Sequence, residues 1–122
     1  MPIVDVELVA RTSGAIATGL AQSLADAVGR VLKSPQGQTW VRVHLLAREH
    51  YAENESSVAE AELPVFVTVL KRASPAKEEL AEEIPALTSA IAQVLGCPMS
   101  CVHVEYAPAA AGRLSFGGRL IE

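Results

Sequence analysis

The sequence is poor in several features that mark particular classes of protein. It holds one tryptophan, two tyrosines, two phenylalanines and two cysteines in 122 residues. The core must therefore be aliphatic, and a disulfide-dense scaffold is excluded. No apolar run approaches the roughly 18 residues of a membrane span, and the N-terminus lacks the pattern of a secretory signal. A net charge of −4 argues against wrapping of nucleic acid or a polybasic membrane anchor. We therefore expect a cytoplasmic protein that binds neither nucleic acid nor membrane.

Half of the residues are hydrophobic, and in the first half of the chain they follow regular patterns. Residues 3–9 alternate between apolar and polar side chains, which predicts a half-buried strand. Thr12-Ser13-Gly14 offers a helix start, and from Ile16 to Leu32 apolar residues recur every fourth position, as on a helix. Pro35 ends that helix, and a second strand follows at 39–46.

The second half repeats this order after a polar linker at 48–63. Residues 64–70 are almost continuously apolar, which predicts a strand covered on both faces. Ser74-Pro75 reads as a helix cap, and the helix stops at Gly96. Pro85 lies inside it and should kink it. A last long strand at 101–106 and a turn or hairpin at 112–118 complete the pattern.

The two halves are therefore copies of one unit, at 2–47 and 64–118. Pro64 follows Pro2 by 62 positions, and Arg72 follows Arg11 by 61. Each unit has the length of a right-handed β-α-β crossover with parallel strands. We expect a single α/β (α+β) domain over 1–122, with a four-stranded sheet and two helices on one face. Another subunit should cover the other face.

Three segments carry a resemblance to a known family. Met1-Pro2-Ile3-Val4 opens the chain, Val41-Arg42-Val43 lies in the second strand, and Gly112-Arg113-Leu114-Ser115-Phe116-Gly117-Gly118 stands near the end. With the repeat, the chain resembles the tautomerase superfamily, as a fused two-copy 4-oxalocrotonate tautomerase. The resemblance covers all but the linker. It implies a cofactor-independent isomerase that interconverts keto and enol groups of small unsaturated 2-oxo acids, assembled as a homotrimer.

Pro2 is the first catalytic candidate. If Met1 is removed, Pro2 carries a secondary amine, and α-amino groups titrate near pH 8 (about 7.7–8.0). Desolvation and neighbouring cations lower that pKa, so the amine can accept a proton at neutral pH and then return it. The resemblance implies this role for Pro2. The nitrogen of Pro64 is an amide and cannot act as a base, so we expect one active centre per chain.

Arginines are the next candidates, because carboxylate and enolate substrates need cations that hold charged oxygens. The resemblance implies that Arg42 polarises the substrate carbonyl and that Arg11 binds a carboxylate. Arg72, with Lys71 beside it, occupies the corresponding place in the second copy. We rank Arg42 and Arg72 as catalytic, and Arg11 and Lys71 as substrate-binding.

Polar residues near the second strand are further substrate-binding candidates. His44 alternates with Arg42 and shares its strand face. Tyr51 or Asn54 could donate to a carbonyl and Glu53 could orient water, since loops at strand ends often carry function. The competing interpretation of 49–54 is a solvated linker.

Apolar residues of the C-terminal turn are also implied by the resemblance. Leu114 and Phe116 fall where the family places an apolar wall against the proline amine, and such a wall lowers the pKa of the amine by desolvation. By contrast, Cys97, Cys101 and His103 do not have the spacing of a common zinc site. We expect no metal.

Two other functions stay open at this stage. A hydratase or dehalogenase acting on haloacrylate-like acids would use a cationic Pro2 as acid and Glu53 to activate water. A non-catalytic, ferredoxin-like binding oligomer would share the β-α-β repeat and have no use for Pro2. The substitution Pro2→Ala separates the enzymes from the binding protein, since it abolishes proton transfer only in an enzyme.

Overall fold

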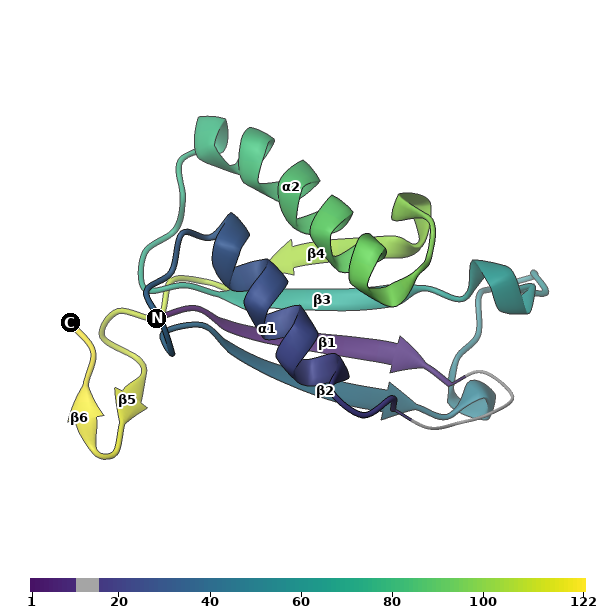
Figure 1. The fold of residues 1–122 in the computed structure, drawn as a ribbon, viewed down its shortest axis with the longest axis horizontal. Helices are drawn as coiled ribbons and strands as arrows, with labels where there is room; N and C mark the ends of the chain where they lie inside the picture. The colour runs from purple at the N-terminus through teal and green to yellow at the C-terminus, as the bar shows by residue number, and fades with distance from the viewer. Residues whose placement is uncertain (11–15) are drawn as a thin grey trace.

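The structure is a computed structural model that describes residues 1–10 and 16–122. Arg11 and the expected helix start at 12–14 lie outside the described residues. The main elements are β1 (Ile3–Val9), α1 (Leu20–Val31), β2 (Trp40–Leu46), β3 (Val65–Leu70), α2 (Lys77–Leu95) and β4 (Val102–Tyr106). Both helices lie on one face of the sheet (Figure 1). Among the described residues, neither helix has the length and apolar character to cross a membrane.

The sheet has the strand order β2-β1-β3-β4. β1 pairs with β2 in parallel and β3 pairs with β4 in parallel, while β1 and β3 are antiparallel. Each half is thus a β-α-β unit, and the two units join through their first strands. This confirms the predicted four-stranded sheet with two helices on one face.

The core lies between the sheet and the helices. Alternate strand residues face the helices, and the largest fully buried side chains are Leu24, Leu87, Ile91, Val4, Val6, Val28, Val67 and Val69. Burial of one such side chain contributes about 1.5–3 kcal/mol. An aliphatic core was expected from the scarcity of aromatic residues, and this is what the structure contains.

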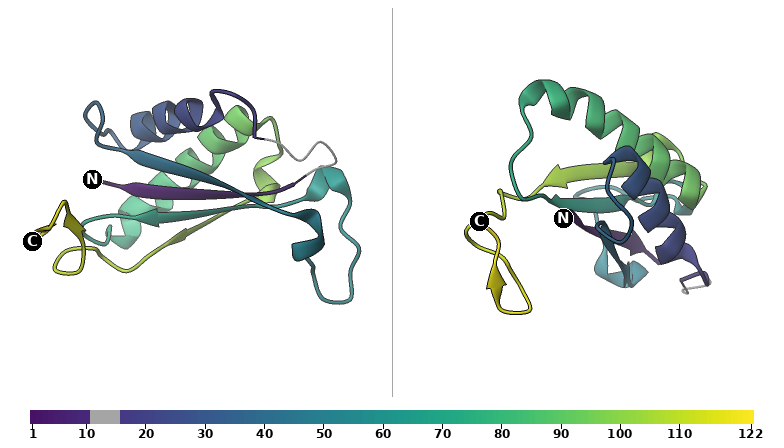
Figure 2. Two further views of the ribbon diagram at one scale, coloured as in Figure 1. Left: turned by 90° about the horizontal axis from the view of Figure 1, so that it is seen from below. Right: turned by 60° about the vertical axis from the view of Figure 1, so that its left-hand side comes forward.

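The opposite face of the sheet is open in the single chain (Figure 2). On β3, Val65 and Val67 are buried, but Phe66 between them is 39% exposed. The prediction that this strand is covered on both faces is therefore wrong for one chain. Its apolar run reflects one buried face and one half-exposed face.

Two predicted helix starts are wrong. α1 begins at Leu20, so Ile16 lies before the helix and is 42% exposed. Gly19 precedes the first turn with φ 82°, which is a left-handed conformation that the helix itself cannot contain. Likewise α2 begins at Lys77, and no side-chain hydrogen bond caps it, so Ser74-Pro75 is not its cap. α2 runs as one helix through Pro85 and ends at Gly96 as predicted.

The linker and the C-terminal hairpin extend from opposite ends of the sheet (Figure 1). The linker contains two short 3₁₀ helices, η1 (Arg48–His50) and η2 (Glu60–Glu62). The predicted C-terminal turn is a hairpin of β5 (Ser115–Phe116) and β6 (Arg119–Leu120). Because β1 and β2 are parallel, Pro2 lies at the hairpin end and the residues after β2 lie at the linker end.

Candidate functional site

Pro2 lies in a pocket at the end of the sheet. Its carbonyl accepts a hydrogen bond from the Trp40 N–H at 3.0 Å, and the residue is buried. Ile3 pairs with Leu70 in the antiparallel register, so Lys71 follows directly opposite Pro2. A pocket of about 300 Å³ is lined by Met1, Pro2, Lys71, Arg72, Ala73, Ser74, Pro75 and Glu79. The structure therefore brings together Pro2 and two cations that the sequence singled out.

Lys71 is held in an internal ion pair. Its Nζ donates to Oε1 of Glu83 at 3.0 Å, and the hydroxyl of Tyr106 donates to Oε2 of the same carboxylate. Burial and the hydrogen bond to Glu83 raise the pKa of Tyr106, so it remains a neutral donor at physiological pH. The three side chains join the end of β3 to α2 and β4.

Arg72 contacts the C-terminal segment. Its Nε donates to the main-chain oxygen of Glu122 at 2.7 Å, and its Nη2 donates to the same oxygen. Among the described residues, no carboxylate side chain forms an ion pair with Arg72. Arg72 therefore lines the pocket with two of its guanidinium nitrogens already bound to Glu122.

The hairpin contributes an aromatic contact near Pro2. The ring of Phe116 packs edge-on against Trp40, with the ring centroids 4.5 Å apart, and Trp40 pairs with Ile3 in the sheet. Leu114 is half-buried, and its carbonyl accepts from the Ile121 N–H at 2.8 Å. Neither Leu114 nor Phe116 lines the pocket directly, although Phe116 lies at its end of the sheet.

Arg42 and His44 lie on the open face of the sheet, away from the Pro2 pocket. Nε and Nη2 of Arg42 donate to the two carboxylate oxygens of Asp5 at 2.6 and 2.9 Å, and Nε2 of His44 lies 3.5 Å from Oδ1 of Asp5. The hydrogen bond from Arg42 lowers the pKa of Asp5. By strand alternation Pro2 faces the helices with Val4 and Val6, so Arg42 does not reach it within one chain.

Tyr51, Glu53 and Asn54 follow η1 at the linker end. The Tyr51 hydroxyl donates to Glu53 at 2.5 Å, which raises the pKa of Tyr51. The seven residues of β1 span about 23 Å, so these side chains lie far from Pro2 in the same chain. The N–H of Ala10, the last described residue before Arg11, donates to the carbonyl of Leu46 at the linker end of the sheet.

Sequence reasoning missed Glu83 and Tyr106. One signal was present, because Glu83 follows Leu80 by three positions and precedes Leu87 by four. That spacing puts an acidic residue on the apolar face of the helix. A charge at such a position predicts a buried partner, since an uncompensated buried carboxylate is costly.

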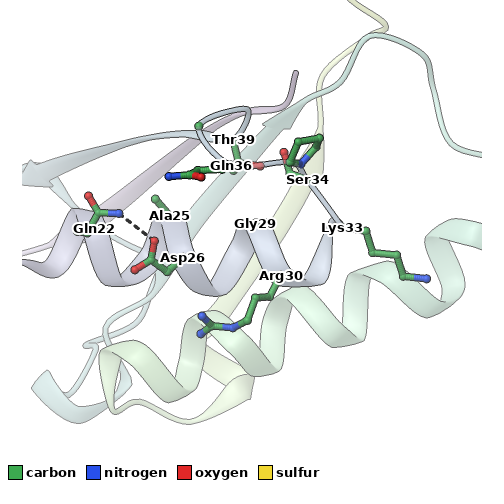
Figure 3. Close-up of a pocket in the computed structure, with 11 residues that line it drawn as sticks. Gln22, Ala25, Asp26, Gly29, Arg30, Lys33, Ser34, Gln36 and Thr39 are labelled. Carbon is green, nitrogen blue, oxygen red and sulfur yellow. Dashed lines mark hydrogen bonds between the residues drawn. The ribbon is translucent and has the colours of Figure 1, made fainter.

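A second hollow lies between the end of α1 and the turn that follows it (Figure 3). Its volume is about 590 Å³, and none of the predicted site residues lines it. Ser34 Oγ and Thr39 Oγ1 are buried there without a hydrogen-bond partner. The side chains of Arg30 and Lys33 extend away from these hydroxyls (Figure 3), so the charged and the buried polar groups do not converge on one ligand position. Among the described residues no three metal-ligand side chains cluster.

The sequence matches no family model and no curated protein, whereas the fold has clear relatives among solved structures. Native fused 4-OT aligns with a TM-score of 0.77 at 20% identity, over 97% of this chain and 94% of that chain. Pt0534 inactivated by 2-oxo-3-pentynoate aligns at 0.75 and 18% identity, over 97% and 94%. FG41 malonate semialdehyde decarboxylase inhibited by 3-bromopropiolate aligns at 0.68 and 20%, over 94% and 88%. Other fused 4-OT structures are described as symmetric and asymmetric trimers. The chain therefore has the same fold as fused 4-OT.

Proposed function

We propose that this chain is a cofactor-independent tautomerase, in which the Pro2 amine moves a proton between oxygen and carbon of a small unsaturated 2-oxo acid. The observation that carries the proposal is the placement of Pro2 in one pocket with Lys71 and Arg72. The fold shared with fused 4-OT supports it. The amine becomes available once Met1 is removed.

The reaction follows from the charges of this pocket. The neutral amine of Pro2 takes the proton of the substrate enol hydroxyl, and the resulting cation returns a proton to carbon, which gives the keto form. Burial of Pro2 and the cation Arg72 favour the neutral amine, and the carboxylate of Glu79 opposes them. Arg72 binds the substrate carboxylate through the guanidinium N–H groups that its contact with Glu122 leaves unoccupied.

Arg42 completes the site from a neighbouring subunit in this proposal. Arg42 lies on the open sheet face, and Tyr51, Glu53 and Asn54 lie at the linker end, so none of them meets the Pro2 pocket of its own chain. In a cytoplasmic homotrimer, the open face of one chain would lie against the next. Arg42 would then stabilise negative charge on the substrate oxygen, and His44 and the linker residues would line the same cleft.

The first experiment combines intact mass with enol–keto kinetics on one sample. A mass that lacks Met1, together with turnover of phenylenolpyruvate that falls as the Pro2 amine is protonated, is the expected result. Pro2→Ala should lower kcat/KM at least about a hundredfold without changing the melting temperature. Retention of Met1 in active protein would refute the proline-base mechanism.

A covalent probe tests the same residue independently. Since 2-oxo-3-pentynoate inactivates Pt0534, we expect it to inactivate this protein by addition of the Pro2 amine to the alkyne. Because addition releases no atoms, the mass should rise by that of the whole probe. Wild-type protein should be labelled and Pro2→Ala should not. Equal labelling of both would show that another nucleophile reacts.

A dehalogenase or hydratase is the second candidate, favoured by one contact. Tyr51 donates to Glu53, and such a pair could hold a water molecule for addition to a haloacrylate. The likeness to malonate semialdehyde decarboxylase inhibited by 3-bromopropiolate is consistent with this class of acid. Halide release from 3-chloroacrylate that is lost in Glu53→Gln, with phenylenolpyruvate turnover absent, would favour this candidate over the tautomerase.

A further inference from the structure

Glu83 is a largely buried carboxylate whose two oxygens both have donors. Its side chain is 16% exposed, and that of Lys71 is 25% exposed. Oε1 accepts from Lys71 at 3.0 Å and Oε2 accepts from Tyr106. A carboxylate removed from water in this way persists only when it is paired and hydrogen-bonded, and here both conditions hold.

This cluster stands directly behind the Pro2 pocket. Lys71 is opposite Pro2 in the continuation of the β1–β3 register, and both residues line the pocket. Strand alternation puts Pro2 and Lys71 on the helix side of the sheet, the side from which Glu83 of α2 reaches Lys71. The ammonium nearest to Pro2 along the strand pair is thus the one that Glu83 binds.

We propose that Glu83 is a positioning residue of the Pro2 site, which holds the ammonium of Lys71 and neutralises its charge. The proposal rests on the proposed function and refines it, because it removes Lys71 from the set of cations that act on Pro2 or the substrate. The other cation of the pocket is Arg72, which Glu122 binds.

The effect of a substitution on the pKa of the Pro2 amine depends on the charged groups around that amine. Lys71, Arg72 and Glu79 line the pocket, while Glu83 and neutral Tyr106 stand behind Lys71. The Asp5–Arg42 pair lies on the other face of the sheet. The amine therefore faces a nearly neutral Lys71–Glu83 pair, the carboxylate of Glu79, and Arg72 in contact with Glu122. Loss of one member of the pair exposes Pro2 to the charge of the other.

The test measures the pKa of the Pro2 amine by ¹⁵N NMR titration of proline-labelled protein from which Met1 has been removed. Where the purified chain retains Met1, treatment with methionine aminopeptidase supplies this form. Glu83→Gln keeps the shape of the side chain and leaves Lys71 uncompensated. It should lower the Pro2 pKa by about 0.5–1 unit, since a like charge disfavours the charged amine. The acid limb of the kcat/KM profile should move equally.

The double variant Glu83→Gln/Lys71→Met tests whether the pair is neutral as a whole, because it replaces the ion pair by neutral groups of similar size. The Pro2 pKa should return to within about 0.2 units of wild type. The matched control is Glu82→Gln, which removes the same charge from the neighbouring, exposed position of α2 and should leave the Pro2 pKa unchanged.

Specific outcomes overturn the proposal. A rise of the Pro2 pKa in the double variant would mean that Lys71 acts on Pro2 as an uncompensated cation. An unchanged pKa in folded Glu83→Gln would mean that the cluster has only a structural role. Should Glu83→Gln not fold, Lys71→Met replaces it: this variant leaves Glu83 uncompensated and should raise the Pro2 pKa, and an unchanged pKa would again mean a structural role only. The titration does not need turnover, so a shift seen in protein without tautomerase activity would refute the proposed function and leave the role of Glu83 intact.

Discussion

At the scale of single residues, the hydroxyl of Tyr106 controls whether the Glu83 carboxylate is fully hydrogen-bonded. Tyr106→Phe removes the donor to Oε2 of Glu83 and leaves a largely buried oxygen without a protein partner. Such a loss costs about 1–3 kcal/mol. Urea unfolding at pH 7 should show a decrease of this size. Tyr51→Phe is the control, because it removes a tyrosine hydroxyl from an exposed pair with Glu53 and should cost less.

The same residue makes stability depend on pH in the alkaline range. The pKa of Tyr106 is raised in the folded state, so folding favours its protonated form. Its contribution is complete below the unfolded tyrosine pKa of about 10 and is lost as the pH rises above that value. Wild-type protein should lose stability between about pH 9.5 and 11 more steeply than Tyr106→Phe. Equal slopes in urea unfolding would show that Tyr106 ionises normally.

Sequence reasoning at this scale singled out Pro2 and Arg72, but their proximity depends on a strand pairing that it did not predict. Pro2 and Arg72 meet because β1 and β3 are antiparallel and both positions fall at one end of the sheet. The Lys71–Glu83–Tyr106 cluster joins three elements that are far apart in sequence, and no local spacing encodes it. Similarly, the pair that Arg42 forms with Asp5 depends on a cross-strand register that the sequence alone leaves free.

At the scale of elements, α2 tolerates a proline in its middle. Pro85 has no N–H for the carbonyl four residues earlier, and its ring crowds that turn. α2 nevertheless spans Lys77–Leu95 as one helix, held by Leu87 and Ile91 in the core. Tertiary burial therefore outweighs a local cost that in an isolated helix amounts to about 3 kcal/mol.

Pro85→Ala should stabilise the protein, because it restores the missing hydrogen bond and relieves the crowding. We expect a gain of about 1–2 kcal/mol, since the substitution also frees the unfolded chain, and a higher urea midpoint would show it. Pro35→Ala is the control. Pro35 lies in an exposed turn outside the helices, so its replacement frees the unfolded chain without a helical gain and should lower stability slightly. A loss of stability in Pro85→Ala would mean that the helix depends on the proline ring.

The spacing of apolar residues predicted which helices and strands form better than it predicted where they begin and end. The valines of β1 and the apolar stripe of α2 gave the right elements, because burial on one face demands those spacings. The start of α1 was wrong since Ile16 continues the four-residue spacing beyond the helix, while Gly19, with φ 82°, begins the turn. The left-handed conformation of Gly19 thus sets the start of α1, although the apolar spacing continues before it to Ile16.

At the scale of the whole molecule, the candidate residues divide between two ends and two faces of one sheet. Pro2 and Arg72 lie at the hairpin end. Arg42 lies on the open face, bound to Asp5, and Tyr51 and Glu53 lie at the linker end. A site that uses all of them requires contact between different subunits. Heterologous contacts of this kind close into rings when the rotation fits, as a trimer would.

Subunit complementation tests this arrangement directly. Pro2→Ala and Arg42→Ala chains should each be inactive, but if a site combines Pro2 of one chain with Arg42 of the next, a mixed trimer contains intact sites. Unfolding the two variants together in equal amounts and refolding them should restore about a quarter of wild-type activity, as random assembly of a heterologous ring predicts. Each variant refolded alone is the control. Activity of the mixture no higher than that of the separate variants would place Pro2 and Arg42 in one chain's site, or Arg42 outside the site altogether.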